Sequence, residues 1–357
     1  MKKVIIIIFS FFVVIKTSYA ISASSYVVMG SDSKNVLMGA NIHEDRLIAS
    51  ISKIMTCIIA IEKGDLNQTI KVDKSILKAV GSAIYIEVGE SISLKDLLYG
   101  MMLRSGNDAA IMIANTISGD MQKFSELMNE YANKIGMTNT YFYNSHGLEE
   151  DSGKGNTSSA YDMALLTSYA MQNKTFRQIF KTQSYTAKSD RKTYVWQNKN
   201  KLLRYDYVTG GKTGYTQKAR RTLVTTANIN GMNIIVVTLN DGNDWNDHLT
   251  LYKKVKNKYQ SIEIINKNDF EIIDDVVYAK DNLYIKNNVQ ITIDKKDATN
   301  LKIKYYLIDK KKYHNNEKIG TANVYLKDKI IYIEPIYVKV NENKTKKFFK
   351  KIWDKIF

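Results

Sequence analysis

The stretch of sequence that decides the fold is SISKIMTCIIAIEKG, residues 50–64. Its apolar residues recur at spacings of three and four, which predicts an α-helix that begins at Ser50 and ends at Gly64. We expect this helix to be buried at the centre of a domain. Its first turn carries Ser50 and Lys53, which lie three residues apart and therefore on one face. The unpaired backbone N–H groups of a first turn favour negative charge that develops there.

A serine and a lysine in this arrangement can do acyl-transfer chemistry without histidine. The Ser50 hydroxyl attacks a carbonyl only if a base removes its proton, and Lys53 is that base only when it is neutral. Burial in an apolar helix and a second cation nearby both lower the pKa of a lysine. Lys212 could be that second cation. Alone, a Ser-x-x-Lys pattern is weak evidence, because a surface lysine near a helix start is the commoner interpretation.

A second segment, Ser105-Gly106-Asn107, follows Ser50 by 55 positions and is expected on a tight connection between two helices. Ser105 could pass a proton to a leaving amine, and Asn107 could hold a peptide carbonyl of a substrate. Taken alone, the triplet is a good turn with a helix N-cap.

A third segment, Lys212-Thr213-Gly214, follows Ser105 by 107 positions in a predicted edge strand. Lys212 would attract a carboxylate, Thr213 would hydrogen-bond to it, and Gly214 would allow an extended peptide to approach closely. A phosphate-binding loop is excluded, because its motif needs a glycine where the chain has Asp206. The three segments in this order predict a serine acyl-transfer site.

The N-terminus reads as an export signal. The 357-residue chain begins Met1-Lys2-Lys3 and continues as an apolar core to Ile15. With small residues before a cleavage point after Ala20, this predicts a secretory signal peptide over residues 1–20. A membrane-spanning anchor is the alternative, but the core is too short to cross a bilayer and Lys16 ends it.

Cysteine and histidine usage points away from disulfides and metal sites. Cys57 is the only cysteine, so no intramolecular disulfide can form, and its apolar surroundings favour a buried structural thiol. No histidine has metal-ligand spacing to another or to the cysteine, so we expect neither a metal nor another cofactor. The four histidines are His43, His146, His248 and His314.

The net charge of +16 indicates an anionic partner. Residues 342–357 alternate apolar pairs, such as Phe348-Phe349, with lysines at helical spacing, which predicts an amphipathic helix on an anionic membrane surface. A helix that packs on its own domain is the alternative. Because the protein is expected to be exported, nucleic acid is not an expected partner.

The rest of the chain predicts an α+β domain over residues 21–260 and a small all-β domain over residues 261–341. In the first domain we expect an antiparallel sheet flanked by helices. Its expected helices are 50–63, 94–103, 108–117, 122–135, 159–171 and 245–258, and its expected strands are 26–29, 35–38, 207–215, 222–228 and 233–240.

Longer segments around the three motifs resemble those of the low-molecular-mass penicillin-binding proteins that are serine-type D-alanyl-D-alanine carboxypeptidases. The resemblance rests on Arg46–Thr56, Leu103–Ala110 and Gly211–Thr216, supported by Asn144–Leu148 and Ser158–Ala164. It covers nearly the whole chain. It implies a β-lactamase/transpeptidase-like domain followed by a β-domain, and a protein at the outer face of the cytoplasmic membrane or in the cell wall.

The resemblance also implies roles for single residues. Ser50 would be the acylated nucleophile, Lys53 its general base and Ser105 a proton carrier. The substrate would be the stem peptide of peptidoglycan, which loses its last D-alanine, and β-lactam antibiotics would be covalent inhibitors. The substrate-binding residues would be Asn107, Lys212, Thr213 and Gly214, with the backbone N–H groups of Ser50 and Tyr215 as the oxyanion hole.

Two departures and two rival functions accompany this interpretation. Ile48 stands where the family usually has proline, and Arg220-Arg221 where a glycine or small residue is usual. A class A-like β-lactamase would need a Glu-x-x-Leu-Asn loop, which Glu126–Asn129 matches poorly. A catalytically idle wall-binding protein would not need the complete set of motif residues.

Overall fold

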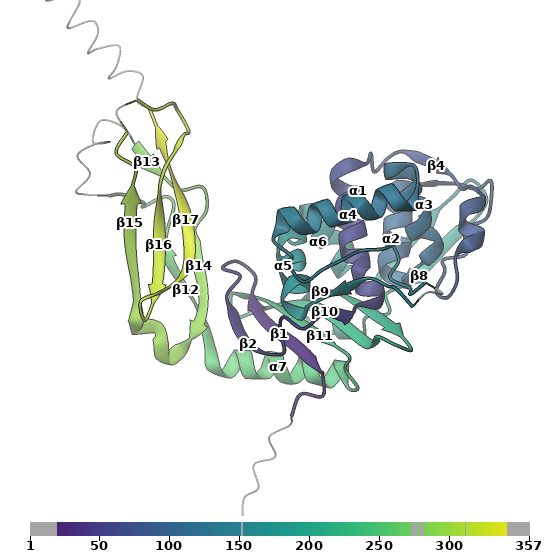
Figure 1. Cartoon of the computed structure of the whole chain (residues 1–357), viewed down its shortest axis with the longest axis horizontal. Coiled ribbons are helices and arrows are strands. Elements are labelled where there is room, and N and C mark those ends of the chain that lie inside the picture. Colours follow the sequence, from purple (N-terminus) through teal and green to yellow (C-terminus); the bar gives the residue numbers. More distant parts are fainter. Residues whose placement is uncertain (1–19, 151–152, 273–277, 279–281, 311, 341–357) are drawn as a thin grey trace, which may run out of the picture.

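The computed structural model describes residues 20–150, 153–272, 278, 282–310 and 312–340. Figure 1 shows a larger domain of helices and sheet, followed by a separate elongated β-domain beyond α7 (Asp244–Lys258). The α+β class expected from the sequence is confirmed. The predicted signal peptide, apart from Ala20, and the predicted tail helix lie outside the described residues.

The larger domain is built on an antiparallel five-stranded sheet in the order β2-β1-β11-β10-β9. Its outer strand β9 pairs with β10 in a register that places Lys212 opposite Val224. Because β9 is an edge strand, every other backbone N–H along it points away from the sheet and can meet another chain. The strands are β1 (Ser25–Gly30), β2 (Val36–Ala40), β9 (Val208–Thr216), β10 (Arg220–Ile229) and β11 (Met232–Leu239).

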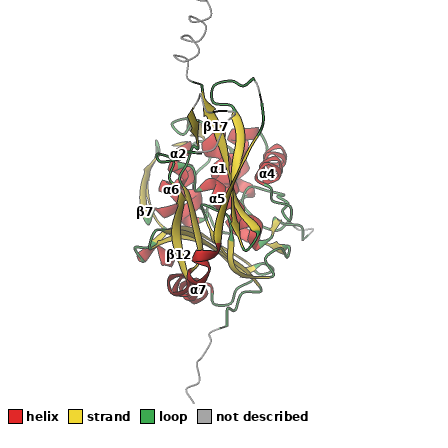
Figure 2. Ribbon diagram, turned by 90° about the vertical axis from the view of Figure 1, so that its left-hand side faces the viewer, coloured by secondary structure: helices red, strands yellow, loops and turns green. Residues whose placement is uncertain are grey.

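Helices cover both faces of this sheet, as expected (Figures 1 and 2). On one face α7 contacts β10 and β11, while α5 and α6 lie against the other face. The central helix α1 contacts α5 and α6 on one side and α2, α3 and α4 on the other. The helices other than α7 are α1 (Lys53–Lys63), α2 (Leu94–Arg104), α3 (Asn107–Ser118), α4 (Met121–Ile135), α5 (Ala160–Ala170) and α6 (Lys174–Lys181).

Helix α1 is the centre of the main hydrophobic core, and its residues from Lys53 to Ala60 are all buried. Cys57 is one of them, and burial raises the pKa of its thiol. The expected start of the helix at Ser50 is wrong by one turn. Ala49–Ser52 form a 3₁₀ turn, and the α-helix begins at Lys53. Ala49 has φ +49°, so the chain enters this turn through a left-handed residue.

Several short elements complete the domain, some of which the sequence analysis did not anticipate. Helix α6 is capped at its N-terminus by Asn173, whose side chain accepts hydrogen bonds from the N–H groups of Thr175 and Phe176. The hairpin of β7 (Ser184–Lys188) and β8 (Thr193–Gln197) follows it. The other short pieces are β3 (Arg46–Leu47), β4 (Thr69–Lys71), β5 (Ser91–Ser93), β6 (Thr157–Ser158), and the 3₁₀ turns Lys74–Lys78 and Lys201–Arg204.

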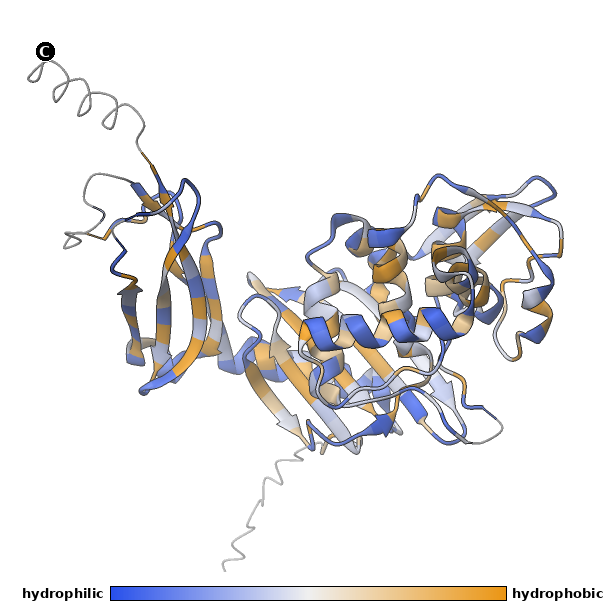
Figure 3. Cartoon of the chain, turned by 45° about the horizontal axis from the view of Figure 1, so that its top comes forward, coloured by the Kyte–Doolittle hydropathy of each residue, from blue (hydrophilic) through white to orange (hydrophobic). Residues whose placement is uncertain are grey.

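The β-domain consists of a pair, β12-β14, and a four-stranded sheet in the order β13-β17-β16-β15. Apolar and polar residues alternate along its strands (Figure 3), and the apolar set forms its own core around Ile291, Val324 and Ile336. No helix within the described residues is long and apolar enough to cross a membrane. The strands are β12 (Tyr259–Ile265), β13 (Asn282–Tyr284), β14 (Val289–Asp294), β15 (Leu301–Leu307), β16 (Lys318–Leu326) and β17 (Lys329–Lys339), with a 3₁₀ turn at Lys295–Asn300.

Candidate active site

The three motif segments meet at one place in the larger domain. Lys53 Nζ lies 2.9 Å from Ser50 Oγ and 2.8 Å from Asn107 Oδ1. Lys212 Nζ donates to Ser105 Oγ at 3.0 Å. A Cβ at Gly214 would be 3.0 Å from the backbone nitrogen of Ser50, so β9 passes directly beside the turn that carries this serine. Segments 55 and more residues apart thus form one cluster of hydroxyls, amines and an amide.

Lys53 is held in the interior with three hydrogen-bond acceptors around it. Its side chain is fully buried, and Nζ donates to Ser50 Oγ, Asn107 Oδ1 and the carbonyl oxygen of His146. Burial, followed by the charges of Lys212 and Lys199, lowers the pKa of Lys53 well below its usual value, and Asp108 opposes this in part. A lysine whose pKa is lowered in this way gives up its proton more readily, and in the neutral form it can accept one from the hydroxyl beside it.

Ser105 and Lys212 form a second buried pair. Ser105 ends α2 with φ +64°, a left-handed conformation that costs a serine about 1–2 kcal/mol. Lys212 is 2% exposed, and burial together with the Lys199 charge lowers its pKa to about 7. The strained backbone of Ser105 therefore directs its hydroxyl to an ammonium group whose charge is itself pH-dependent near neutrality.

Asn107 is held on both sides by the loop that precedes α2. Its backbone N–H donates to the carbonyl of Ser82 at 2.7 Å, and its side-chain Nδ2 donates to the carbonyl of Val80 at 2.6 Å. Buried Asp108 supports the same loop, because its carboxylate accepts the N–H groups of Ile84 and Tyr85. The amide of Asn107 is thus oriented so that its oxygen meets Lys53.

The carbonyl oxygen of His146 is a part of the site that the sequence analysis did not predict. It accepts a hydrogen bond from Lys53 Nζ at 2.5 Å, and Ser50 Oγ lies 3.4 Å away. Burial and the Lys53 charge lower the pKa of the His146 ring to about 3, so the ring is neutral at ordinary pH. A backbone carbonyl carries no side-chain signature, and only the resemblance of Asn144–Leu148 to family segments pointed to this loop.

Gly147 fixes this loop against the turn that carries Ser50. It has φ +88°, and a Cβ there would lie 2.1 Å from the Ala49 carbonyl oxygen and 2.5 Å from Ser52 Oγ. Only a residue without a side chain can approach the turn so closely.

We therefore expect Gly147→Ala to lower the free energy of unfolding by about 3 kcal/mol, from the left-handed backbone and the overlap together. Gly136→Ala is the matched control, because Gly136 has the same φ of +88° but no atom within 4 Å of the added Cβ. Urea unfolding of both variants measures the difference. Equal losses would mean that the loop moves away from Ala49 without cost.

The neighbourhood of β9 shows how the chain accommodates its two departures from the family pattern. The N–H of Ile48 donates to the Asn156 carbonyl at 3.1 Å, a bond that a proline could not make. Arg220 has φ +58°, the left-handed conformation that a glycine adopts without strain. Near these residues Thr213 is half-buried, whereas the side chain of Tyr215 is 60% exposed.

Metal binding has no evident basis at this site. No group of three or more His, Cys, Asp or Glu side chains among the described residues is arranged to hold an ion. The donors that converge here are hydroxyls, amines, an amide and a backbone carbonyl. Such groups move protons and bind peptides.

Comparison with known proteins matches both domains. The family model described as D-alanyl-D-alanine carboxypeptidase matches residues 13–243, and the model described as penicillin-binding protein 5, C-terminal domain, matches residues 259–344. The crystal structure of penicillin-binding protein 5 from Haemophilus influenzae is similar with a TM-score of 0.74 and 26% identity, covering 90% of this chain and 98% of that one.

Curated relatives carry the same family name. D-alanyl-D-alanine carboxypeptidase DacF of Bacillus subtilis is 36% identical over 222 residues, which are 60% of this chain and 56% of that protein. D-alanyl-D-alanine carboxypeptidase DacC of Escherichia coli is 30% identical over an alignment of 365 positions, gaps included, that covers 94% of this chain and 88% of that protein. The chain therefore belongs to the D-alanyl-D-alanine carboxypeptidase family of low-molecular-mass penicillin-binding proteins, as its three motifs indicate.

Proposed function

We propose that this chain removes the terminal D-alanine from peptidoglycan stem peptides through an acyl-enzyme on Ser50, and that β-lactams acylate the same serine. The observation that carries the proposal is the 2.9 Å contact between Ser50 Oγ and Lys53 Nζ. The lysine is buried, its pKa is lowered, and the motif strand β9 lies beside it. These are the requirements for a nucleophile that is activated by a neutral amine.

In the first half of the reaction, neutral Lys53 accepts the proton of Ser50 while the serine oxygen attacks the carbonyl of the last peptide bond. The N–H groups of Ser50 and Tyr215 stabilise the oxyanion. Lys212 and Thr213 bind the terminal carboxylate of the substrate. As the peptide C–N bond breaks, Ser105, which is hydrogen-bonded to Lys212, passes the proton taken up by Lys53 on to the leaving D-alanine amine, so that Lys53 is neutral again. Water then hydrolyses the ester on Ser50 by the reverse proton route.

Incubation with purified muropeptides, followed by mass spectrometry, tests the function directly. The expected product is the stem peptide shortened by one D-alanine, with free D-alanine released in equal amount. Release of a cross-linked partner instead would indicate endopeptidase activity, and no change in any muropeptide would contradict the proposal.

A class A-like β-lactamase is the rival with the same motifs. Its deacylating glutamate has no counterpart in Glu126–Asn129, because this segment lies in the middle of α4. We therefore expect slow turnover of penicillin with a long-lived adduct. Rapid penicillin hydrolysis by the purified protein would favour the β-lactamase.

The pH dependence of the reaction should respond to Lys199, a third lysine at the site. Its Nζ donates to Ser82 Oγ at 2.9 Å, and its charge lowers the pKa of both Lys53 and Lys212. Activity should rise with pH as Lys53 loses its proton and fall above about pH 7 as Lys212 loses its charge. Removing the Lys199 charge raises both pKa values, so Lys199→Gln should shift both limbs of the profile to higher pH.

The measurement is kcat/KM against pH with a D-Ala-D-Ala peptide. Lys201→Gln is the control, since Lys201 is also exposed but contributes to neither pKa shift. Limbs that stay in place in the Lys199 variant, or that move to lower pH, would contradict the electrostatic role of this lysine.

We further propose that the protein is exported and that residues 342–357 hold it on the anionic outer face of the cytoplasmic membrane. The basic, amphipathic pattern of this segment supports the proposal. Truncation before Asn343 should release the protein from membranes with its activity intact. If the truncated protein still sediments with membranes, another part of the chain binds the lipid.

A further inference from the structure

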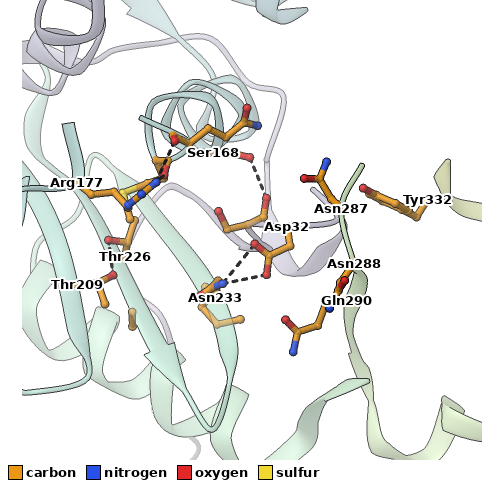
Figure 4. Close-up of a pocket in the computed structure, with 15 residues that line it drawn as sticks. Asp32, Ser168, Arg177, Thr209, Thr226, Asn233, Asn287, Asn288, Gln290 and Tyr332 are labelled. Atoms are coloured by element: carbon orange, nitrogen blue, oxygen red, sulfur yellow. Dashed lines mark hydrogen bonds between the residues drawn. The ribbon is translucent and has the colours of Figure 1, made fainter. Parts of the chain in front are cut away.

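A cavity of about 650 Å³ lies between the larger domain and the β-domain, apart from the active site (Figure 4). One wall comes from the β1–β2 turn, from α5 and α6, and from β9, β10 and β11. The opposite wall comes from the β13–β14 connection, from Gln290 in β14 and from Tyr332 on β17. Beside the cavity, Asn35 Nδ2 donates to the Thr292 carbonyl at 2.8 Å and so ties the two domains together.

The walls are polar but carry little charge. Twelve of the fifteen residues that line the cavity have polar side chains, and five of these are amides. Asp32 and Arg177 are the two charged side chains among them. The Arg177 guanidinium donates hydrogen bonds to the backbone carbonyls of Met171 and Gln172 at 2.6 and 3.0 Å. Arg177 and Asp32 are of opposite sign, so the lining carries no net charge that would favour an ionic ligand.

The amides divide into two groups. Asn233 and Asn288 hold the walls, since Asn233 Nδ2 donates to Asp32 at 3.0 Å and Asn288 Nδ2 donates to Glu263 at 2.9 Å. The side-chain amides of Gln172, Asn287 and Gln290 make no hydrogen bond within the described part of the chain. Each of these three presents both a donor and an acceptor to whatever fills the cavity.

Asp32 and Tyr332 add a carboxylate and a ring from opposite walls. Desolvation raises the pKa of Asp32, although much of the residue is exposed, and the charge of Asp32 contributes to a raised pKa of Tyr332. The Tyr332 hydroxyl is already engaged, because it donates to Glu334 at 3.0 Å. Tyr332 can therefore offer a ligand the part of its ring that is not packed on the β-domain core, and its hydroxyl oxygen as an acceptor.

We propose that this cavity binds a sugar unit of a glycan chain. Neighbouring hydroxyls of a sugar donate and accept at once, as the free amides do, and a carboxylate such as Asp32 accepts from a hydroxyl. The apolar face of a sugar ring packs against an aromatic ring such as Tyr332. A cavity of about 650 Å³ lies within the ordinary range for small-molecule sites. A metal ion would need more carboxylates than Asp32 supplies.

The test uses the full chain and a tetramer of β-1,4-linked N-acetylglucosamine in isothermal titration calorimetry. The tetramer should bind the unmodified protein, and Gln172→Ala and Asn287→Ala should each weaken binding about fivefold, the effect of one lost hydrogen bond. Gln178→Ala is the matched control, because Gln178 is an exposed amide on α6 that does not line the cavity. It should bind the tetramer with unchanged affinity.

Absence of tetramer binding by the unmodified protein at millimolar concentration would overturn the proposal, and so would binding that the Gln172 and Asn287 variants leave unchanged. Acylation of Ser50 by penicillin, followed in each variant, shows that the protein is folded. Because binding is measured without turnover, its failure would leave the proposed carboxypeptidase reaction untouched. Loss of binding in Ser50→Ala would place the sugar at the catalytic serine instead and would also contradict this assignment.

Discussion

Ser50→Ala should abolish carboxypeptidase activity and acylation by penicillin. The hydroxyl is the atom that forms the ester, and no other hydroxyl is hydrogen-bonded to Lys53 within the described residues. Loss of a serine nucleophile lowers kcat on the order of 10⁶-fold in serine hydrolases. Alanine fits the site, because Ser50 is half-buried and, among the described residues, its Oγ is hydrogen-bonded only to Lys53 and the His146 carbonyl.

Fluorescent penicillin labelling and D-alanine release measure the effect. Ser184→Ala is the control, since Ser184 is an exposed serine in β7 outside the cluster. Ser50→Ala should keep the thermal unfolding midpoint of the parent protein. Residual labelling at the parent rate would show that another residue is the nucleophile.

Lys53→Met should slow acylation about 10³-fold, within the usual range for loss of a general base. Methionine has a similar length and can fill the buried space of the lysine stem, but it cannot accept the proton of Ser50. It also leaves the acceptors on Asn107 and His146 without their donor. Lys63→Met is the control, because Lys63 lies at the exposed end of the same helix. Fluorescent penicillin should label it at the rate of the parent protein.

A second variant separates the base from the hydrogen-bond donor. Lys53→Arg keeps a donor to Asn107 and the His146 carbonyl, but arginine remains charged and cannot act as a base. Acylation of Lys53→Arg by penicillin should be as slow as acylation of Lys53→Met. An Arg variant that acylates at near the parent rate would mean that position 53 supplies charge or orientation rather than proton transfer.

The sequence was a good guide where the chemistry resides in side chains. Periodicity predicted a buried helix that begins at Ser50, a tight connection at Ser105–Asn107 and a strand at Lys212–Gly214, and the structure brings these three segments together. The reasons given for a low lysine pKa, burial and the neighbouring Lys212, are the two largest causes in the structure. These features follow from spacing and composition, which are local properties of the chain.

The sequence did not predict features of the site that depend on backbone groups or on a loop distant in the chain. The start of the helix was misplaced because apolar spacing does not distinguish a 3₁₀ turn from the first turn of an α-helix. The His146 carbonyl was missed because every residue has such a group. Lys199 lowers the pKa of Lys53 and Lys212 because the β8–β9 connection folds back over Ser82. The local sequence around Lys199 does not predict that contact.

The central claim is that Ser50 is acylated through Lys53. It is tested most directly by mass spectrometry of the full chain after brief exposure to benzylpenicillin, with peptide mapping of the product. We expect one penicilloyl group per chain, located on the peptide that contains Ser50 and absent at a pH low enough to protonate Lys53. An adduct on any other residue, or no adduct in a folded protein, would contradict the mechanism.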